Sequence, residues 1–269
     1  MTTIIDGAAA DIKIENEKTL GDALSGLEKW AGESGFCLSG VTVDGVRAGA
    51  DDMDALFNRE IRDITTLGID TAPFAAMYAD ALSALSAALR SWDRAGDDRN
   101  EAESQWRGSP AAAFIARYDK PLSDLLKGRF SDEIAAEAAG IVKDREAEAE
   151  NPVAAFLSME DGLNEYVSRL SDLPLDLQTG NDRRAAETIE RFSGFTQKLF
   201  RLLPFLKYAM IEKPCGNAEL FDEFKSALKE FLAAYENKDM VLCGDLAEYE
   251  IAPRIKDIYA TLKEKITAN

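Results

Sequence analysis

The stretch Thr71-Ala72-Pro73 marks the point at which the residue pattern changes. Before it, short runs of β-branched and apolar residues alternate with charged residues, which is typical of strands that are buried on one face. After it, apolar residues recur every three or four positions, which is the period of amphipathic helices. The sequence therefore predicts an α+β protein that is predominantly α, with a small sheet domain over residues 1–71 and a helical body over residues 72–269.

The sheet domain is predicted to hold four strands and two helices. The predicted strands cover residues 2–6, 11–15, 36–44 and part of 61–71, and Gly7 turns the first hairpin. A helix is predicted after Thr19, which forms a variant of the capping box with Asp22. Its apolar face is predicted to contain Leu20, Leu24, Leu27 and Trp30. A shorter helix is predicted over residues 51–60, capped by Asp51 or Asp52.

This order of elements, together with the turn Val43-Asp44-Gly45, resembles the β-grasp arrangement of ubiquitin-like domains, in which a small sheet wraps one helix. The resemblance covers about a quarter of the chain. It does not imply conjugation, because the diglycine tail of ubiquitin is absent, and the single cysteine of this region rules out a four-cysteine ferredoxin cluster. The resemblance implies a protein-binding head. Alternatively, the sheet only packs against the helical body.

The helical body is predicted to be an antiparallel bundle, because short connectors favour antiparallel neighbours. Helix breaks are predicted at Gly108-Ser109-Pro110 and at Asn151-Pro152, and the second break is a candidate boundary between two sub-bundles. Residues 171–180 lack a helical period and are predicted to form an extended connector with buried leucines. The last helix is predicted to begin near Asp239 and to bend at Pro253, with Val241, Leu242 and Tyr249 on its buried face.

The composition excludes several classes of function. The formal net charge is −18, which repels phosphate backbones and anionic lipids, so neither nucleic acid nor a membrane is expected as a partner. A protein with a basic surface fits this charge; alternatively, the acidity only provides solubility. The chain has no histidine, which removes Ser-His-Asp and Cys-His catalysis and the usual zinc and di-iron sites.

Cysteine usage and hydropathy point to a soluble protein without a cofactor. Cys37 and Cys243 lie in apolar runs and are expected to be buried, whereas Cys215 is expected to be an exposed loop thiol. No disulfide framework, metal or cofactor is predicted from three distant cysteines. No apolar run is long enough to span a membrane, and the N-terminus lacks the pattern of a signal peptide, so a cytoplasmic location is expected.

The most distinctive candidate site is the segment Gln178–Arg184. A loop that leads into a helix can hold an anion on free backbone N–H groups, here near Thr179 and Gly180, and Arg183 and Arg184 would add positive charge. Alternatively, this is a capped helix start whose arginines pair with local carboxylates.

Two further sites are weaker candidates. Asp245 and Glu248 share a helix face and could bind a cation or pair with the arginines Arg183, Arg184 or Arg201, although a structural ion pair or a solvated face is an alternative. Core packing is the default expectation for Trp106, and the alternative is that Trp106 and Arg107 form a partly exposed contact with a partner.

Together these features predict a non-enzymatic protein-interaction module without catalytic residues. It would act as an adaptor or a chaperone-like protein, for example in the assembly of motility machinery, and it could also form a homodimer. The competing interpretation is a small-ligand or anion-binding protein, or an enzyme, that uses Gln178–Arg184 with Asp245 and Glu248.

Overall fold

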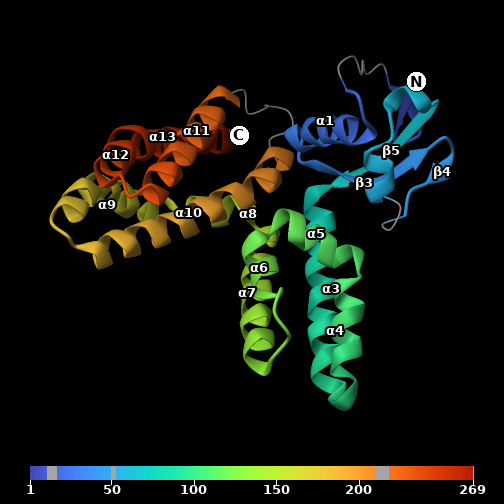
Figure 1. The fold of residues 1–269 in the computed structure, drawn as a ribbon, viewed down its shortest axis with the longest axis horizontal. Helices are drawn as coiled ribbons and strands as arrows, with labels where there is room; N and C mark the ends of the chain where they lie inside the picture. The colour runs from blue at the N-terminus through green and yellow to red at the C-terminus, as the bar shows by residue number, and fades with distance from the viewer. Residues whose placement is uncertain (11–16, 50–52, 210–217, 269) are drawn as a thin grey trace. The chain divides into compact units, whose positions relative to one another are not determined.

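The computed structural model describes residues 1–10, 17–49, 53–209 and 218–268. Its N-terminal part is a mixed five-stranded sheet with the strand order β2-β1-β5-β3-β4, in which β1 runs parallel to β5 and the other neighbours are antiparallel (Figure 1). The strands are β1 (Thr2–Ile5), β2 (Ala8–Ala10), β3 (Phe36–Val43), β4 (Val46–Arg47) and β5 (Thr66–Pro73). The helix α1 (Leu20–Glu33) packs on this sheet. Its buried leucines meet a core of Val41, Val43, Ile64, Leu67 and Ile69.

Two Asp-Gly turns connect the hairpins and bind them to β5. Asp6 and Gly7 have φ values of 50° and 81°, and Asp44 and Gly45 have φ values of 51° and 84°, as two-residue hairpin turns of the primed type require. The Asp6 carboxylate accepts hydrogen bonds from the backbone N–H and the hydroxyl of Thr71, both at 2.7 Å. The Asp44 carboxylate accepts the backbone N–H groups at the start of β5. These bonds hold the pKa of both carboxyl groups below the usual value.

Most of the sheet domain agrees with the sequence-based prediction. Thr19 and Asp22 form the complete capping box, and residues 36–43 and 66–73 are strands. The predicted strand at 11–15 and the capping residues Asp51 and Asp52 lie outside the described residues, and the short helix is described as α2 (Met53–Phe57). Trp30 was predicted to be buried but is half exposed, because Ala31 takes the buried position at the end of the helix.

The rest of the chain is helical, as predicted, so the class α+β, predominantly α, is confirmed. The first helices are α3 (Phe74–Arg94), η3 (Gly96–Asp98), α4 (Arg99–Arg107), α5 (Pro110–Tyr118), α6 (Lys120–Leu125), α7 (Asp132–Glu150) and α8 (Pro152–Leu157). The later ones are α9 (Glu160–Gln178), α10 (Asp182–Ala209), α11 (Ala218–Glu236), α12 (Met240–Asp245), the π-helix η4 (Leu246–Ile251) and α13 (Ala252–Thr267). The predicted breaks are present: Ser109 caps α5 and Asn151 caps α8, each followed by proline.

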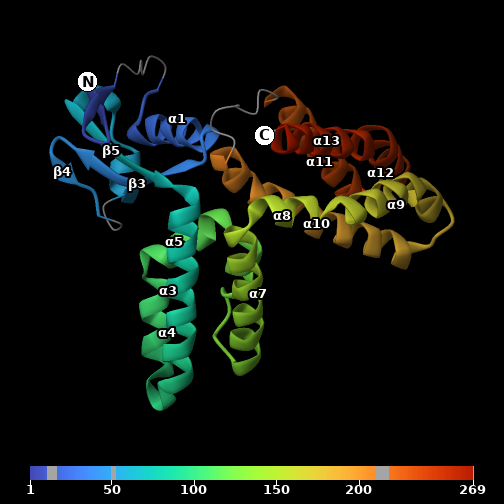
Figure 2. The ribbon, with the colours of Figure 1, turned by 180° about the vertical axis from the view of Figure 1, so that it is seen from behind.

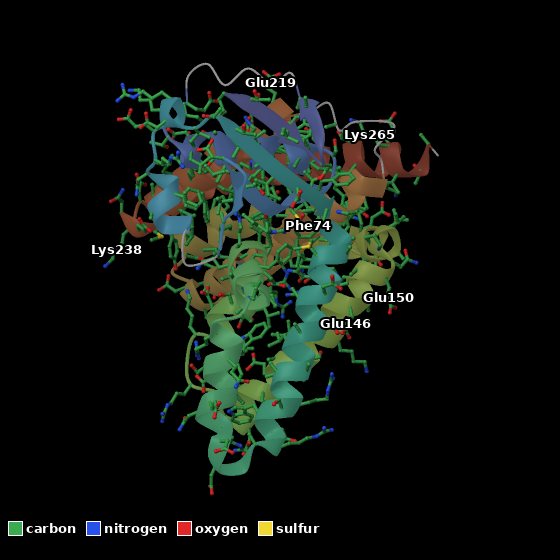
Figure 3. All side chains as sticks on the ribbon, turned by 90° about the vertical axis from the view of Figure 1, so that its right-hand side faces the viewer. Phe74, Glu146, Glu150, Glu219, Lys238 and Lys265 are labelled. Atoms are coloured by element: carbon green, nitrogen blue, oxygen red, sulfur yellow. The ribbon has the colours of Figure 1, made fainter. Side chains whose placement is uncertain are left out.

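The chain forms two compact units, Met1–Glu150 with Pro204–Ile211 and Asn151–Leu203 with Glu212–Asn269. In the first unit, β5 continues directly into α3, and Phe74 lies at this junction (Figure 3). Its ring packs at 5.7 Å from Tyr78 and 5.2 Å from Phe205. Glu28 of α1 contacts both Arg117 and Tyr118 of α5, so the sheet domain and these helices share polar contacts as well as a core.

In the second unit, α12 and α13 pack against α9, and α11 packs against α12 and α13 (Figure 2). The prediction of an extended connector at 171–180 is wrong, because α9 continues through Pro174 to Gln178. The leucines of this segment are not all buried as predicted, because Leu173 is in the core whereas Leu175 is exposed. A β-carbon on Gly244 would lie 2.9 Å from Cα of Pro174, so the glycine gives α12 the room to cross α9 at the proline.

The last predicted helix is divided into three parts. Between α12 and α13, the backbone N–H of Ala252 bonds to the carbonyl of Ala247, five residues earlier, which is the π-helical spacing. Pro253 follows directly, and the wider turn precedes a residue that has no N–H to donate. The prediction that Val241, Leu242 and Tyr249 are buried is wrong, because all three are exposed.

Candidate functional site

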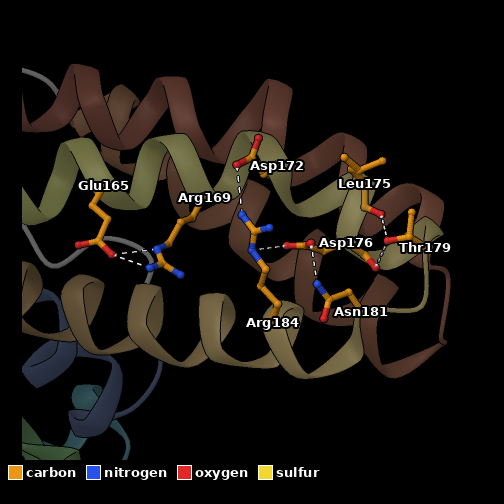
Figure 4. A network of polar contacts seen from close by, with 8 residues as sticks. All are labelled: Glu165, Arg169, Asp172, Leu175, Asp176, Thr179, Asn181 and Arg184. Atoms are coloured by element: carbon orange, nitrogen blue, oxygen red, sulfur yellow. Dashed lines mark hydrogen bonds and ion pairs between the residues drawn. The ribbon is translucent and has the colours of Figure 1, made fainter.

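The segment Gln178–Arg184 is a tight link between α9 and α10, and its residues Thr179, Asn181 and Arg184 form polar contacts within the chain (Figure 4). The Thr179 hydroxyl donates to the carbonyl of Leu175 at 2.8 Å. Gly180 has a φ of 72°, which ends α9 in the left-handed region. The backbone N–H of Asn181 bonds to the carbonyl of Asp176 at 2.9 Å. The loop therefore closes on the end of α9.

Asp176 places a negative charge beside the start of α10. Its carboxylate is buried, accepts a hydrogen bond from the Asn181 side-chain amide at 3.3 Å and lies 3.3 Å from Nε of Arg184. Arg184 also lies 3.6 Å from Asp172, and the almost fully exposed Arg183 pairs with Glu187 at 3.0 Å. These contacts are those of a helix start whose arginines pair with local carboxylates. Anion binding by this loop stays a prediction.

The acids Asp245 and Glu248 do not pair with these arginines. Asp245 is exposed at the end of α12, and Glu248 is half-buried in η4. Arg183 and Arg184 pair instead with carboxylates of α9 and α10. Within the described parts of the chain, no group of three or more His, Cys, Asp or Glu residues could hold a metal ion.

Trp106 is buried at 5% exposure, so the default expectation of core packing is confirmed and the alternative of a partly exposed contact is wrong for this residue. The reason is that α4 packs against α3 and directs the indole into the core of the first unit. Arg107 pairs with Glu103 at 2.7 Å and also donates to the carbonyl of Gly128. A shallow cavity of about 250 Å³ lies beside these two residues and Lys127. The guanidinium therefore has a structural role.

Sequence inspection did not identify a buried polar centre in the first unit. Asp119 is 1% exposed and accepts hydrogen bonds from Tyr78 Oη at 2.6 Å, Arg145 Nε at 2.9 Å and the backbone N–H of Leu122 at 3.2 Å. It joins α3, α6 and α7. Its position before Lys120-Pro121 marks it as a helix cap in the sequence, but nothing local indicates the tyrosine or the arginine.

The second feature that sequence inspection missed is a group of exposed apolar side chains in the second unit. We call the following residues the α11–α12 corner: Leu232, Tyr235, Val241 and Leu242, with exposed fractions of 56%, 42%, 64% and 44%. The first two lie in the last turns of α11, and the other two lie in the first turn of α12. Leu175 and Tyr249 are also exposed in this unit. A signal was present: Leu228, Leu232 and Tyr235 repeat at the spacing of a second apolar stripe, beside the core stripe of α11.

Backbone hydrogen bonds hold the turn between α11 and α12 in a defined conformation. Lys238 has a φ of 59°, its N–H bonds to the carbonyl of Tyr235 at 3.1 Å, and the N–H of Asp239 bonds to the carbonyl of Ala234 at 2.9 Å. This pair of bonds is a Schellman motif. The Asp239 carboxylate then caps α12 by accepting the N–H of Leu242 at 3.1 Å. The turn between α11 and α12 is thereby held by backbone and capping bonds, and the four exposed apolar side chains lie on either side of it.

Comparisons with known proteins match both parts of the chain. Residues 1–73 match the model of the TP0873 N-terminal domain, and residues 155–261 match a domain of unknown function, DUF8042. An uncharacterized protein of Treponema pallidum (strain Nichols) is 22% identical over 264 residues, which cover 96% of this chain and 94% of that protein. No solved structure matches the chain. The first match ends with β5, and the α11–α12 corner lies inside the second.

None of the described helices combines the length and the apolar character that crossing a membrane requires.

Proposed function

We propose that the protein is a non-enzymatic interaction module, an adaptor or chaperone-like protein, that binds another protein through the α11–α12 corner. The observation that carries this proposal is the exposure of four large apolar side chains within residues 232–242. Exposed apolar clusters on folded proteins mark interaction sites, and tyrosine is enriched among the residues that contribute most to binding. Burying the exposed half of one such side chain gains about 1 kcal/mol.

The corner residues are not needed to complete the core of their own unit. On α11, the buried positions are filled by neighbours such as Phe231 and Ala234, and on α12 by Cys243. The Cys243 thiol lies 4.0 Å from the carbonyl of Phe231, so the two helices already meet inside the corner. The side chains of Leu232 and Val241 are exposed and lie outside this contact. Their apolar character therefore has no use in the fold and supports an external contact.

The alternative of a small-anion site or an enzyme has weaker support. The arginines of Gln178–Arg184 are neutralised by Asp172, Asp176 and Glu187, which leaves little net positive charge for a bound anion. A ligand would have to displace a buried carboxylate from its arginine.

We also propose that the N-terminal sheet domain is β-grasp-like. The strand order β2-β1-β5-β3-β4, with a parallel central pair and one helix on the sheet, supports this proposal. The half-exposed Trp30 of α1 is its candidate contact residue.

The test is an affinity capture from a native lysate of the source cells with three baits. The corner bait carries Val241→Ser and Leu242→Ser, and the control bait carries Leu175→Ser and Val46→Ser, which remove two exposed apolar side chains outside the corner. All four sites are exposed, so each change is expected to alter stability by no more than about 0.5 kcal/mol. We expect a protein that the wild-type and control baits enrich and the corner bait loses. If the wild type enriches nothing, or if the corner bait retains every enriched protein, the proposal is wrong.

A further inference from the structure

Acidic residues are frequent in the segment that contains the α11–α12 corner. Residues 236–250 contain five acidic side chains and one basic side chain, Lys238. Glu236, Asp239 and Asp245 are exposed, and the last two flank the exposed Val241 and Leu242 along α12. The apolar surface is therefore edged by negative charge.

Three of these acids lack a positive partner. Among the residues that the structure describes, no basic side chain forms an ion pair with Glu236, Asp239 or Asp245. Some acids outside this segment do form such pairs: Glu160 lies 2.6 Å from Nζ of Lys263, and Glu187 lies 3.0 Å from Nε of Arg183. The corner is thus a place where apolar side chains and unpaired carboxylates occur together.

The geometry of the apolar residues favours a helix as the bound element. Leu228, Leu232 and Tyr235 follow one another at i, i+4 and i+7 along α11, which is the spacing of the ridges that pack between helices. A bound strand would need an open sheet edge, and every described element of the second unit is helical.

We propose that the α11–α12 corner binds an amphipathic helix whose apolar face is flanked by lysine or arginine, an inference that rests on the proposed function. Leucine-sized side chains of this helix would cover Leu232, Tyr235 and Val241, and its cations would face Glu236 and Asp245. Such charge complementarity speeds association and selects against acidic helices. A second copy of this chain is disfavoured, because its formal net charge is −18.

The probe is a fluorescent amphipathic peptide of leucine and lysine with a helical apolar stripe, compared with the same peptide carrying glutamate at every lysine. Fluorescence anisotropy with the full-length protein measures both affinities. We expect the lysine peptide to bind, with an affinity that falls as salt is raised, and the glutamate peptide not to bind. The corner variant with Val241→Ser and Leu242→Ser should weaken binding of the lysine peptide at least tenfold.

Nonspecific attraction to an acidic protein is excluded by a matched pair of variants. Glu236→Gln with Asp245→Asn removes two charges at the corner, and Asp97→Asn with Asp98→Asn removes two exposed charges in the first unit. The corner pair should weaken binding about fivefold, because fivefold is about 1 kcal/mol, or about 0.5 kcal/mol for each of two exposed ion pairs, while the control pair should change it less than twofold. Equal effects of the two pairs would overturn the inference.

Other outcomes separate this inference from the proposed function. If both peptides bind equally and the serine variant loses both, the corner binds apolar helices without a charge preference, so the inference fails and the function stands. If sedimentation analysis shows a wild-type dimer that the serine variant loses, the occupant is a second copy, which also overturns the inference. If neither peptide binds, the basic-helix inference is wrong.

Discussion

Replacing Gly244 by alanine tests how the second unit is packed. The new β-carbon would lie 2.9 Å from both Cα and Cβ of Pro174 and 3.1 Å from its Cγ. Carbon atoms in good contact are about 3.5 to 4.0 Å apart, so the methyl group would overlap α9 by about 0.6 Å or more. One of these atoms belongs to the backbone and the others to a rigid ring, so the strain cannot be relieved by rotating a side chain. The two helices would have to separate.

The magnitude follows from two opposing effects. Overpacking of this kind costs about 1 to 3 kcal/mol, whereas alanine is better than glycine in a helix by about 0.8 to 1 kcal/mol. We therefore expect Gly244→Ala to lower the free energy of unfolding by about 1 kcal/mol. Gly194→Ala is the matched control, because Gly194 is an exposed residue of α10 in the same unit whose added β-carbon would meet no atom within 4 Å. It should gain about 0.8 kcal/mol from helix propensity alone.

The assay is urea unfolding followed by far-UV circular dichroism, which gives the free energy of unfolding of each protein. The dependence of this free energy on the urea concentration is compared among the three proteins. The difference between the two alanine variants, about 2 kcal/mol, isolates the steric effect from helix propensity. If Gly244→Ala stabilised the protein as much as Gly194→Ala, the close crossing of α9 and α12 at Pro174 would be refuted.

Three further predictions concern the first unit. Asp119→Ala should lower the free energy of unfolding by about 3 to 5 kcal/mol, because Tyr78 Oη loses its buried acceptor and Arg145 keeps only Glu148, at 3.6 Å; a loss below about 1 kcal/mol in urea unfolding would contradict this. The pKa of Asp44 is lowered from 3.8 by its hydrogen bonds, so its contribution to stability is complete above about pH 4 and is lost as the pH falls through the lowered pKa. In the Asp44→Asn variant, the melting temperature should therefore fall less steeply as the pH is lowered. A melting temperature that falls with pH as steeply as that of the wild type would disprove this. Burial raises the pKa of Cys37 to about 11, so peptide mass spectrometry should find it unalkylated by iodoacetamide in the native protein and alkylated in the denatured protein.

Local signals in the sequence predicted the elements that depend on a few neighbouring residues. The capping box of Thr19 and Asp22 and the Asp44-Gly45 turn formed as predicted, because each requires a backbone conformation that those residues favour. The same is true of the helix starts at Ser109 and Asn151, where a capping side chain is followed by proline.

The errors arose where distant residues decide the outcome. The helix α9 continues through Pro174, and Gly244, 70 positions further along the chain, gives α12 the room to cross α9 at this proline. The burial of Leu242 was overestimated because Cys243 fills the core position. An apolar residue at helical spacing indicates a face, but only the packing of neighbouring helices shows whether that face is covered.

The most direct test of the proposed function is site-specific photo-crosslinking in living source cells. A benzoylphenylalanine at Tyr235 or Leu242 places the reactive group on the α11–α12 corner, and the same group at Val46, a more exposed site in the first unit, serves as the control. The interaction module predicts a discrete adduct with another protein from the two corner positions and none from Val46. No adduct from either corner position, or the same adduct from all three positions, would contradict the claim that this corner binds a partner.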